Sequence, residues 1–86
     1  MKHAGSAALE GIEDLLQQLR TVPGLVERKQ GIFYRRSRAF LHFHEDPSGL
    51  YADVRLLPDE DFVRIPINTG AQRRRLLQEV RKLRAA

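Results

Sequence analysis

The spacing of hydrophobic positions changes twice along the chain and predicts a helix, then a series of strands, then a second helix. Residues 7–20 and 70–85 repeat apolar side chains every three or four positions, as one face of a helix does. Between residues 25 and 67, apolar and polar side chains alternate, which is typical of strands with one buried face. Residues 1–6 show neither period, and we expect them to be disordered.

The order of these elements predicts one α+β domain over residues 1–86. Four strands are expected at residues 32–35, 39–44, 50–56 and 62–67, with a short fifth strand at residues 25–29. Pro66 has no N–H to donate, so the last strand is expected at a sheet edge. One-sided helices and a one-sided sheet bury their apolar faces together. The predicted fold is therefore a two-layer sandwich, with one antiparallel sheet and both helices on one face.

The register of the two central strands follows from the turn between them. Residues 46–49 predict a hairpin, because Pro47 presets a turn value of φ and Gly49 accepts a positive φ. If Glu45 pairs with Leu50, the apolar side chains of both strands share one face, whereas a one-residue slip would mix them with polar ones. This register pairs Phe40 with Arg55, Leu41 with Val54, His42 with Asp53, Phe43 with Ala52 and His44 with Tyr51.

Extended to all strands, the alternation assigns each side chain to a helix-covered face or to an open face. The expected helix-covered face consists of Ile32, Tyr34, Leu41, Phe43, Val54, Leu56, Val63, Ile65 and Ile67. The expected open face consists of Phe33, Arg35, Phe40, His42, His44, Tyr51, Asp53, Arg55 and Arg64.

The composition excludes several classes of function. The chain has 86 residues, 42% of them hydrophobic and 30% charged, which fits one small globular domain. It has no cysteine, which excludes disulfides and thiolate chemistry. We find no apolar run of membrane-spanning length and no secretory signal, and we expect a cytoplasmic protein. No nucleophile triad, phosphate-binding loop or paired-carboxylate pattern is present, so we expect no enzymatic activity.

The last predicted helix collects the positive charge. Residues 68–86 contain six basic residues and one acidic residue, so the formal net charge of +4 arises there. Thr69 and Gln72 match a capping box at its start. The basic side chains form a candidate contact for nucleic acid or another anion, and a solvated helix face is the alternative. They are Arg73, Arg74, Arg75, Arg81 and Lys82.

His42 and His44 are the sharpest local chemical feature. Alternate side chains of a strand stand on one face about 6.5–7 Å apart, so two imidazoles can share a metal ion, with Asp53 as a third ligand. The alternative is structural, with His–Asp and His–Tyr pairs that stabilise an exposed sheet face. We favour the structural alternative and expect neither a metal nor a cofactor.

The expected open face gives the main functional hypothesis. Exposed aromatic side chains among Arg and His often mark a binding site. We expect a binding domain that uses this face to contact an unidentified protein partner or a second copy of the chain, with nucleic-acid binding by the last helix as the alternative. The candidate residues are Phe33, Phe40, His42, His44, Tyr51, Asp53, Arg55 and Arg64.

Three segments resemble small bacterial proteins of the luciferase-domain family. They are Val-Pro-Gly-Leu-Val-Glu-Arg at residues 22–28, Arg-Ala-Phe-Leu-His-Phe-His at residues 38–44 and Tyr-Ala-Asp-Val-Arg-Leu at residues 51–56. The resemblance covers about residues 9–85. It implies the order helix, strands, helix, but no light-emitting chemistry and no catalytic residue. The order is also similar to YjbR-like and frataxin-like domains, and a link of some YjbR-like proteins to DNA binding supports the nucleic-acid alternative.

Overall fold

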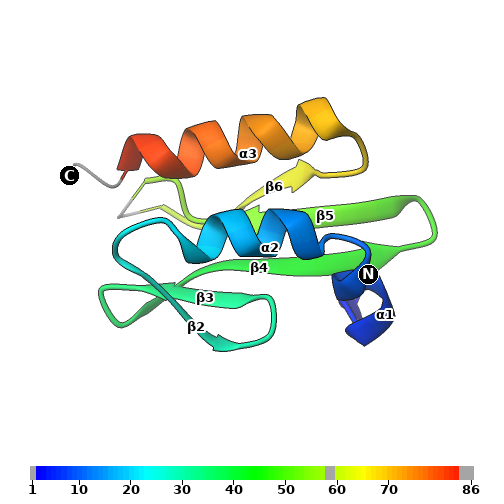
Figure 1. The fold of residues 1–86 in the computed structure, drawn as a ribbon. Coiled ribbons are helices and arrows are strands. Elements are labelled where there is room, and N and C mark those ends of the chain that lie inside the picture. Colours follow the sequence, from blue (N-terminus) through cyan, green and yellow to red (C-terminus); the bar gives the residue numbers. More distant parts are fainter. Residues whose placement is uncertain (1, 58–59, 84–86) are drawn as a thin grey trace.

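The structure is a computed structural model that describes residues 2–57 and 60–83 (Figure 1). These residues form three helices and six strands in a mixed α/β order. The elements are β1 (Lys2–His3), α1 (Ser6–Glu10), α2 (Glu13–Arg20), β2 (Leu25–Lys29), β3 (Ile32–Arg35), β4 (Arg38–Asp46), β5 (Gly49–Val54), β6 (Val63–Pro66) and α3 (Gly70–Leu83).

The strands form a single antiparallel sheet, as the alternating pattern predicts. Its order is β2-β3-β4-β5-β6, and β1 pairs with β4 beyond the end of β3. The sheet therefore has one strand more than the sequence predicts, because the chain start contributes β1. The edge position of β6 confirms the prediction made from Pro66, and β2 forms the other edge.

The register between β4 and β5 is the predicted one. Glu45 pairs with Leu50, and the ladder continues to Leu41 and Val54 without interruption. Gly49 has φ of +134°, which only glycine adopts without strain, so the hairpin uses the residue that the sequence provides for it.

The side chains of β3 lie on the opposite faces from those predicted. Phe33 is 1% exposed and pairs directly with Leu41, which places it on the core face. The cause is a β-bulge between β3 and β4: Tyr34 pairs with Ala39, so Phe40 is an extra residue on β4. An unbroken alternation cannot pass through such a bulge, and the phase of β3 is therefore inverted. Phe40 is also buried, in the same core cluster as Phe33.

The chain start differs from the expected disorder. From Lys2 onward it is described, and β1 is joined to β4 by the pairing of His3 with His44. Two further contacts continue this attachment: the Ala4 amide donates to the Phe43 carbonyl at 3.0 Å, and the Gly5 amide donates to Glu45 Oε2 at 2.9 Å. Residue 1 lies outside the described residues.

The helices end close to the predicted positions, with one interruption. The first predicted helix is divided into α1 and α2 at Gly11 and Ile12, as a glycine in the first turns favours. The capping box at the start of α3 is present, since Gln72 N donates to Thr69 Oγ1 and Thr69 N donates to Gln72 Oε1, both at 3.1 Å. Among the described residues, no helix is both long and apolar enough to cross a bilayer.

One core joins the helices to the sheet. Leu16 and Leu19 of α2 and Leu76 of α3 are fully buried in the same cluster as Leu41 and Val54 of the sheet. Figure 1 shows α2 and α3 running along the strands. Residues that alternate with Leu41 and Val54 stand on the other face of the sheet, which carries the candidate site.

Candidate functional site: an imidazole cluster on the sheet

Polar side chains gather in the middle of β4, β5 and β6, on the face of the sheet that the sequence predicts to be open and that we call the open face. His42 and His44 alternate with the buried Leu41 and Phe43, so the two imidazoles stand opposite the core. Asp53 of β5 lies directly opposite His42 of β4 on one side and directly opposite Arg64 of β6 on the other. The structure brings six of the eight predicted site residues together: His42, His44, Tyr51, Asp53, Arg55 and Arg64.

A third imidazole joins the two expected ones. His3 lies opposite His44 in the β1–β4 ladder, and its ring stacks on that of His44 with 4.8 Å between centroids. The ring of His42 lies 4.9 Å from His44 and 5.4 Å from His3. One ring nitrogen from each residue lies within 4.8 Å of the other two. We call His3, His42 and His44 the imidazole cluster.

Asp53 places a negative charge beside this cluster. Its Oδ2 lies 3.2 Å from His44 Nε2, and the residue is only 6% exposed. Arg64 donates from Nε to Oδ1 at 2.8 Å and from Nη2 to Oδ2 at 2.9 Å. Such a two-pronged partner makes a buried carboxylate tolerable. These hydrogen bonds hold the pKa of Asp53 below its ordinary value, so Asp53 is ionised at neutral pH.

The two imidazoles of β4 are neutral at pH 7. Burial lowers the pKa of His42, and the nearby His44 lowers it further. Burial also lowers the pKa of His44, and the charge of Asp53 opposes this shift without reversing it. Nε2 of His44 and Nδ1 of His42 lie 3.0 Å apart, so at most one of these nitrogens carries a proton. The nitrogen without a proton accepts a hydrogen bond from the other, and a ligand at this position would replace that hydrogen bond.

The cluster leaves one of its own polar atoms unsatisfied. Within the described part of the chain, Nδ1 of His44 is buried without a hydrogen-bond partner. An unpaired buried polar atom costs about 1–3 kcal/mol, and folded proteins keep few of them. The two imidazoles of β4 are therefore partly buried, and their own neighbours leave one nitrogen of His44 unpaired.

A cation and an aromatic ring border the cluster on the β6 side. The ring of Phe62 meets that of His42 edge-on, with 4.9 Å between centroids. The guanidinium carbon of Arg55 lies 4.3 Å from the centre of the Phe62 ring. Arg55 is also fixed by a hydrogen bond from Nη1 to the Glu60 carbonyl at 2.8 Å. This stack shields one side of His42 from water.

Two predicted site residues are not part of the open face. Phe33 and Phe40 are buried in the core, because the bulge between β3 and β4 changes the alternation there. The predicted aromatic platform is therefore wrong at these two positions. Phe40 does border a cavity of about 220 Å³ that Arg35 and Arg55 also line, at the β3–β4 hairpin.

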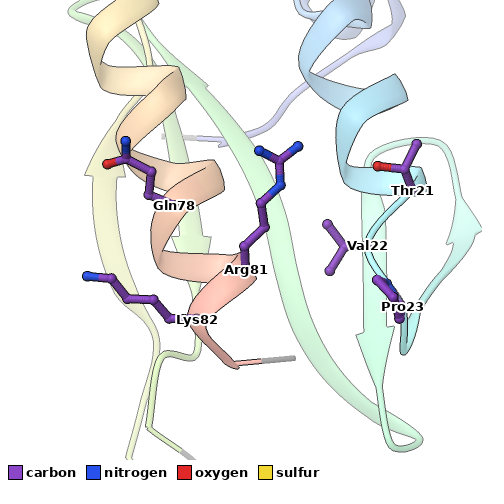
Figure 2. A pocket seen from close by; sticks show the side chains of 6 residues that line it. All are labelled: Thr21, Val22, Pro23, Gln78, Arg81 and Lys82. Atoms are coloured by element: carbon purple, nitrogen blue, oxygen red, sulfur yellow. The ribbon is translucent and has the colours of Figure 1, made fainter. Parts of the chain in front are cut away.

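The basic residues of α3 divide into two groups. Arg73 is half-buried and donates from Nε to the Ile67 carbonyl at 2.9 Å, so it supports the start of the helix. The other four lie on the exposed side of α3: Arg74, Arg75, Arg81 and Lys82. A shallow groove separates the end of α3 from the turn after α2. Figure 2 shows its two sides, which are Gln78, Arg81 and Lys82 on α3 and Thr21, Val22 and Pro23 on the turn.

Sequence reasoning missed two residues of the site. Phe62 had a signal, because the alternation that places Arg64 on the open face also places Phe62 there, two positions earlier. His3 had none, since a strand of two residues shows no period and only its pairing with β4 reveals its position.

No family model, curated protein or solved structure matches the chain. The resemblance to the luciferase-domain family stays a prediction. The function of the site is therefore inferred from its own geometry.

Proposed function

We propose that the protein is a small binding domain whose binding site is the open face of the sheet at the imidazole cluster and Asp53. The observation that carries this proposal is the incompletely paired cluster: the two partly buried rings of β4 lie beside a buried carboxylate, and Nδ1 of His44 has no partner within the described residues. Asp53 and Nε2 of His44 are paired with their neighbours, but a site arranged only for stability would pair Nδ1 of His44 as well. A ligand that accepts or supplies the missing interactions would complete the cluster.

The proposal includes a two-layer arrangement, with α2 and α3 on the face opposite to the cluster. The single core supports it, because side chains of both helices are buried with Leu41 and Val54, which alternate with the site residues. In Figure 1, α2 passes in front of the central strands and α3 runs beside β6. This arrangement leaves the cluster accessible to a ligand or to a second copy of the chain.

The test is a chemical-shift titration of the full chain with defined probes, together with its solution mass. The probes are Zn²⁺, inorganic phosphate and single-stranded and duplex oligonucleotides. We expect at least one probe, or self-association, to give saturable shifts at Tyr51, Asp53 and the three imidazoles. A monomer whose open-face resonances respond to none of these probes would overturn the proposal.

Nucleic-acid binding by α3 is the second candidate, and the four exposed cations on one side of the helix favour it. Phosphate contacts make affinity fall steeply with salt, by a slope of about one for each contact. The same oligonucleotide titrations therefore separate the two functions. Shifts at Arg74 and Arg81 that vanish at moderate salt, with the imidazole cluster unchanged, would favour this candidate. Arg74→Gln with Arg81→Gln should then abolish them.

A further inference from the structure

The topology places three imidazoles at the corners of a small triangle. His42 and His44 occupy alternate positions of β4, so their side chains share a face. His3 enters from the neighbouring strand, directly opposite His44. Directly opposed residues of an antiparallel pair have Cβ atoms about 4.5–5.5 Å apart, which brings the third ring into reach of the other two. This placement depends on backbone pairing at two strands and not on one flexible side chain.

The spacing of the nitrogens is close to what a metal ion requires. With metal–nitrogen distances of 2.0–2.1 Å and tetrahedral angles, ligand nitrogens lie about 3.3 Å from one another. Nε2 of His44 and Nδ1 of His42 are already 3.0 Å apart. All three ligand nitrogens lie within 4.8 Å of one another, so the most distant pair has to approach by about 1.5 Å to reach the spacing of a metal site. His3 is exposed, so rotation of its ring can supply this movement without disturbing the core.

We propose that the imidazole cluster is a binding site for a divalent transition metal ion of the Zn²⁺ class, with His3, His42 and His44 as the three protein ligands. This inference rests on the proposed function, since it names the ligand of the same site. Imidazole nitrogen is a preferred donor for Zn²⁺, Ni²⁺ and Cu²⁺, whereas Mg²⁺ and Ca²⁺ prefer oxygen. The class of metal therefore follows from the donor set.

The surroundings of the cluster fit such an ion. Asp53 supplies the nearest negative charge, beside His44, and Arg64 fixes its position. Its Oδ2 faces Nε2 of His44, so this carboxylate favours a bound cation through its charge and not by holding the second nitrogen of the ring. Three imidazoles leave a fourth position for water, as in zinc sites that interact with further ligands.

The sequence alone favoured a structural role for His42 and His44, with no metal. The sequence offers two histidines and Asp53 as metal ligands, but in the structure both oxygens of Asp53 accept hydrogen bonds from Arg64. The third donor, His3, lies 39 positions before His42 in the chain and becomes a neighbour only through β1. The added ligand is what changes the interpretation.

The test is calorimetric titration of the full chain, carrying no histidine tag, with Zn²⁺ at pH 7. We expect one ion per chain, and His3→Ala should weaken the affinity at least about tenfold. His3 is exposed, so this variant should keep the thermal midpoint of the metal-free protein. Lys2→Ala is the matched control on the same strand and should leave the affinity unchanged. His42→Ala should weaken binding as His3→Ala does.

Co²⁺ provides a second readout that a weak surface contact would not give. Bound by three imidazoles and water, it should show the intense visible absorption of a four-coordinate ion, and His3→Ala should remove that band. Weak Zn²⁺ binding that both histidine variants leave unchanged would overturn the metal site. If phosphate, an oligonucleotide or a second copy still shifts the open face, the proposed function survives this failure. If no probe does, both fail.

Discussion

His44 contacts Asp53 diagonally across the sheet, although the residue opposite Asp53 in the ladder is His42. The distance between His44 Nε2 and Asp53 Oδ2 is 3.2 Å. From the other side, Arg64 of β6 holds the same carboxylate with two hydrogen bonds. Asp53 therefore connects the imidazoles of β4 to the edge strand, and both the stability and the chemistry of the open face depend on it.

Asp53→Asn should lower the free energy of unfolding by about 1.5–3 kcal/mol, because charge-assisted hydrogen bonds of a buried group are lost. Urea unfolding at pH 7 measures this change. Glu10→Gln is the matched control, an exposed acid in α1, and should stay within about 0.5 kcal/mol of the parent protein. Equal stability of the two variants would mean that the Asp53–Arg64 pair adds nothing to folding.

Phe33→Ala should cost about 3–5 kcal/mol, because the ring is 1% exposed in the core. Val26→Ala, at a side chain that is 55% exposed, should change stability by less than about 0.5 kcal/mol. Phe33→Leu provides a milder variant if the alanine protein does not fold. A small loss of stability in both Phe33 variants would contradict the core position of this ring and favour the open-face position that unbroken alternation predicts.

The central hairpin could be predicted from sequence because its pattern is redundant. A one-residue slip would place Leu41 on the face of Asp53, and the structure has the register, set by the turn, that keeps Leu41 opposite Val54. The bulge at Phe40 is different, since one extra residue changes the phase of β3 without altering the composition of either strand. The alternation within one strand carries no information on how that strand pairs with its neighbour, so it cannot reveal the bulge.

The site could be predicted only in part for a related reason. His42, His44 and Asp53 belong to long strands with clear alternation, so their shared face follows from period two. His3 belongs to a strand of two residues, held by pairing with His44 and by the Ala4–Phe43 hydrogen bond. These are long-range contacts, and no local pattern in the sequence encodes them.

Gly49→Ala should destabilise the protein more than Gly24→Ala. Both glycines have positive φ, +134° and +90°, so each substitution introduces backbone strain of about 1–3 kcal/mol. A Cβ at Gly49 would also lie 2.6 Å from Asn68 Oδ1, whereas one at Gly24 would meet nothing within 4 Å. Asn68 Oδ1 accepts a hydrogen bond from the Leu50 amide, which the clash would disturb. Thermal unfolding of the two variants compares their stabilities, and a lower midpoint for Gly24→Ala than for Gly49→Ala would contradict this prediction.

Glu27 should make stability fall in acid. Arg20 donates to both of its oxygens and the Gly31 amide adds a third hydrogen bond, so the pKa of Glu27 is lowered, chiefly by Arg20. A lowered pKa in the folded state adds stability above the ordinary value of 4.5, and this stability is lost as the pH falls through the folded value. Glu27→Gln should therefore lower stability at pH 7 and flatten its decline below about pH 4.5. Urea unfolding of the parent protein and of Glu27→Gln as a function of pH measures this difference. If their stabilities fall in parallel below about pH 4.5, Glu27 is not the group responsible.

The central claim is that three imidazoles from β1 and β4 meet on the open face of the sheet. The most direct measurement is the set of nuclear Overhauser contacts among the histidine rings in the metal-free full chain at pH 7. The structure predicts contacts between the rings of His3 and His44, whose centroids are 4.8 Å apart, and between His42 and Phe62, at 4.9 Å. A His3 ring with no contact to His44 or His42, and with the chemical shifts of a free peptide, would contradict the claim.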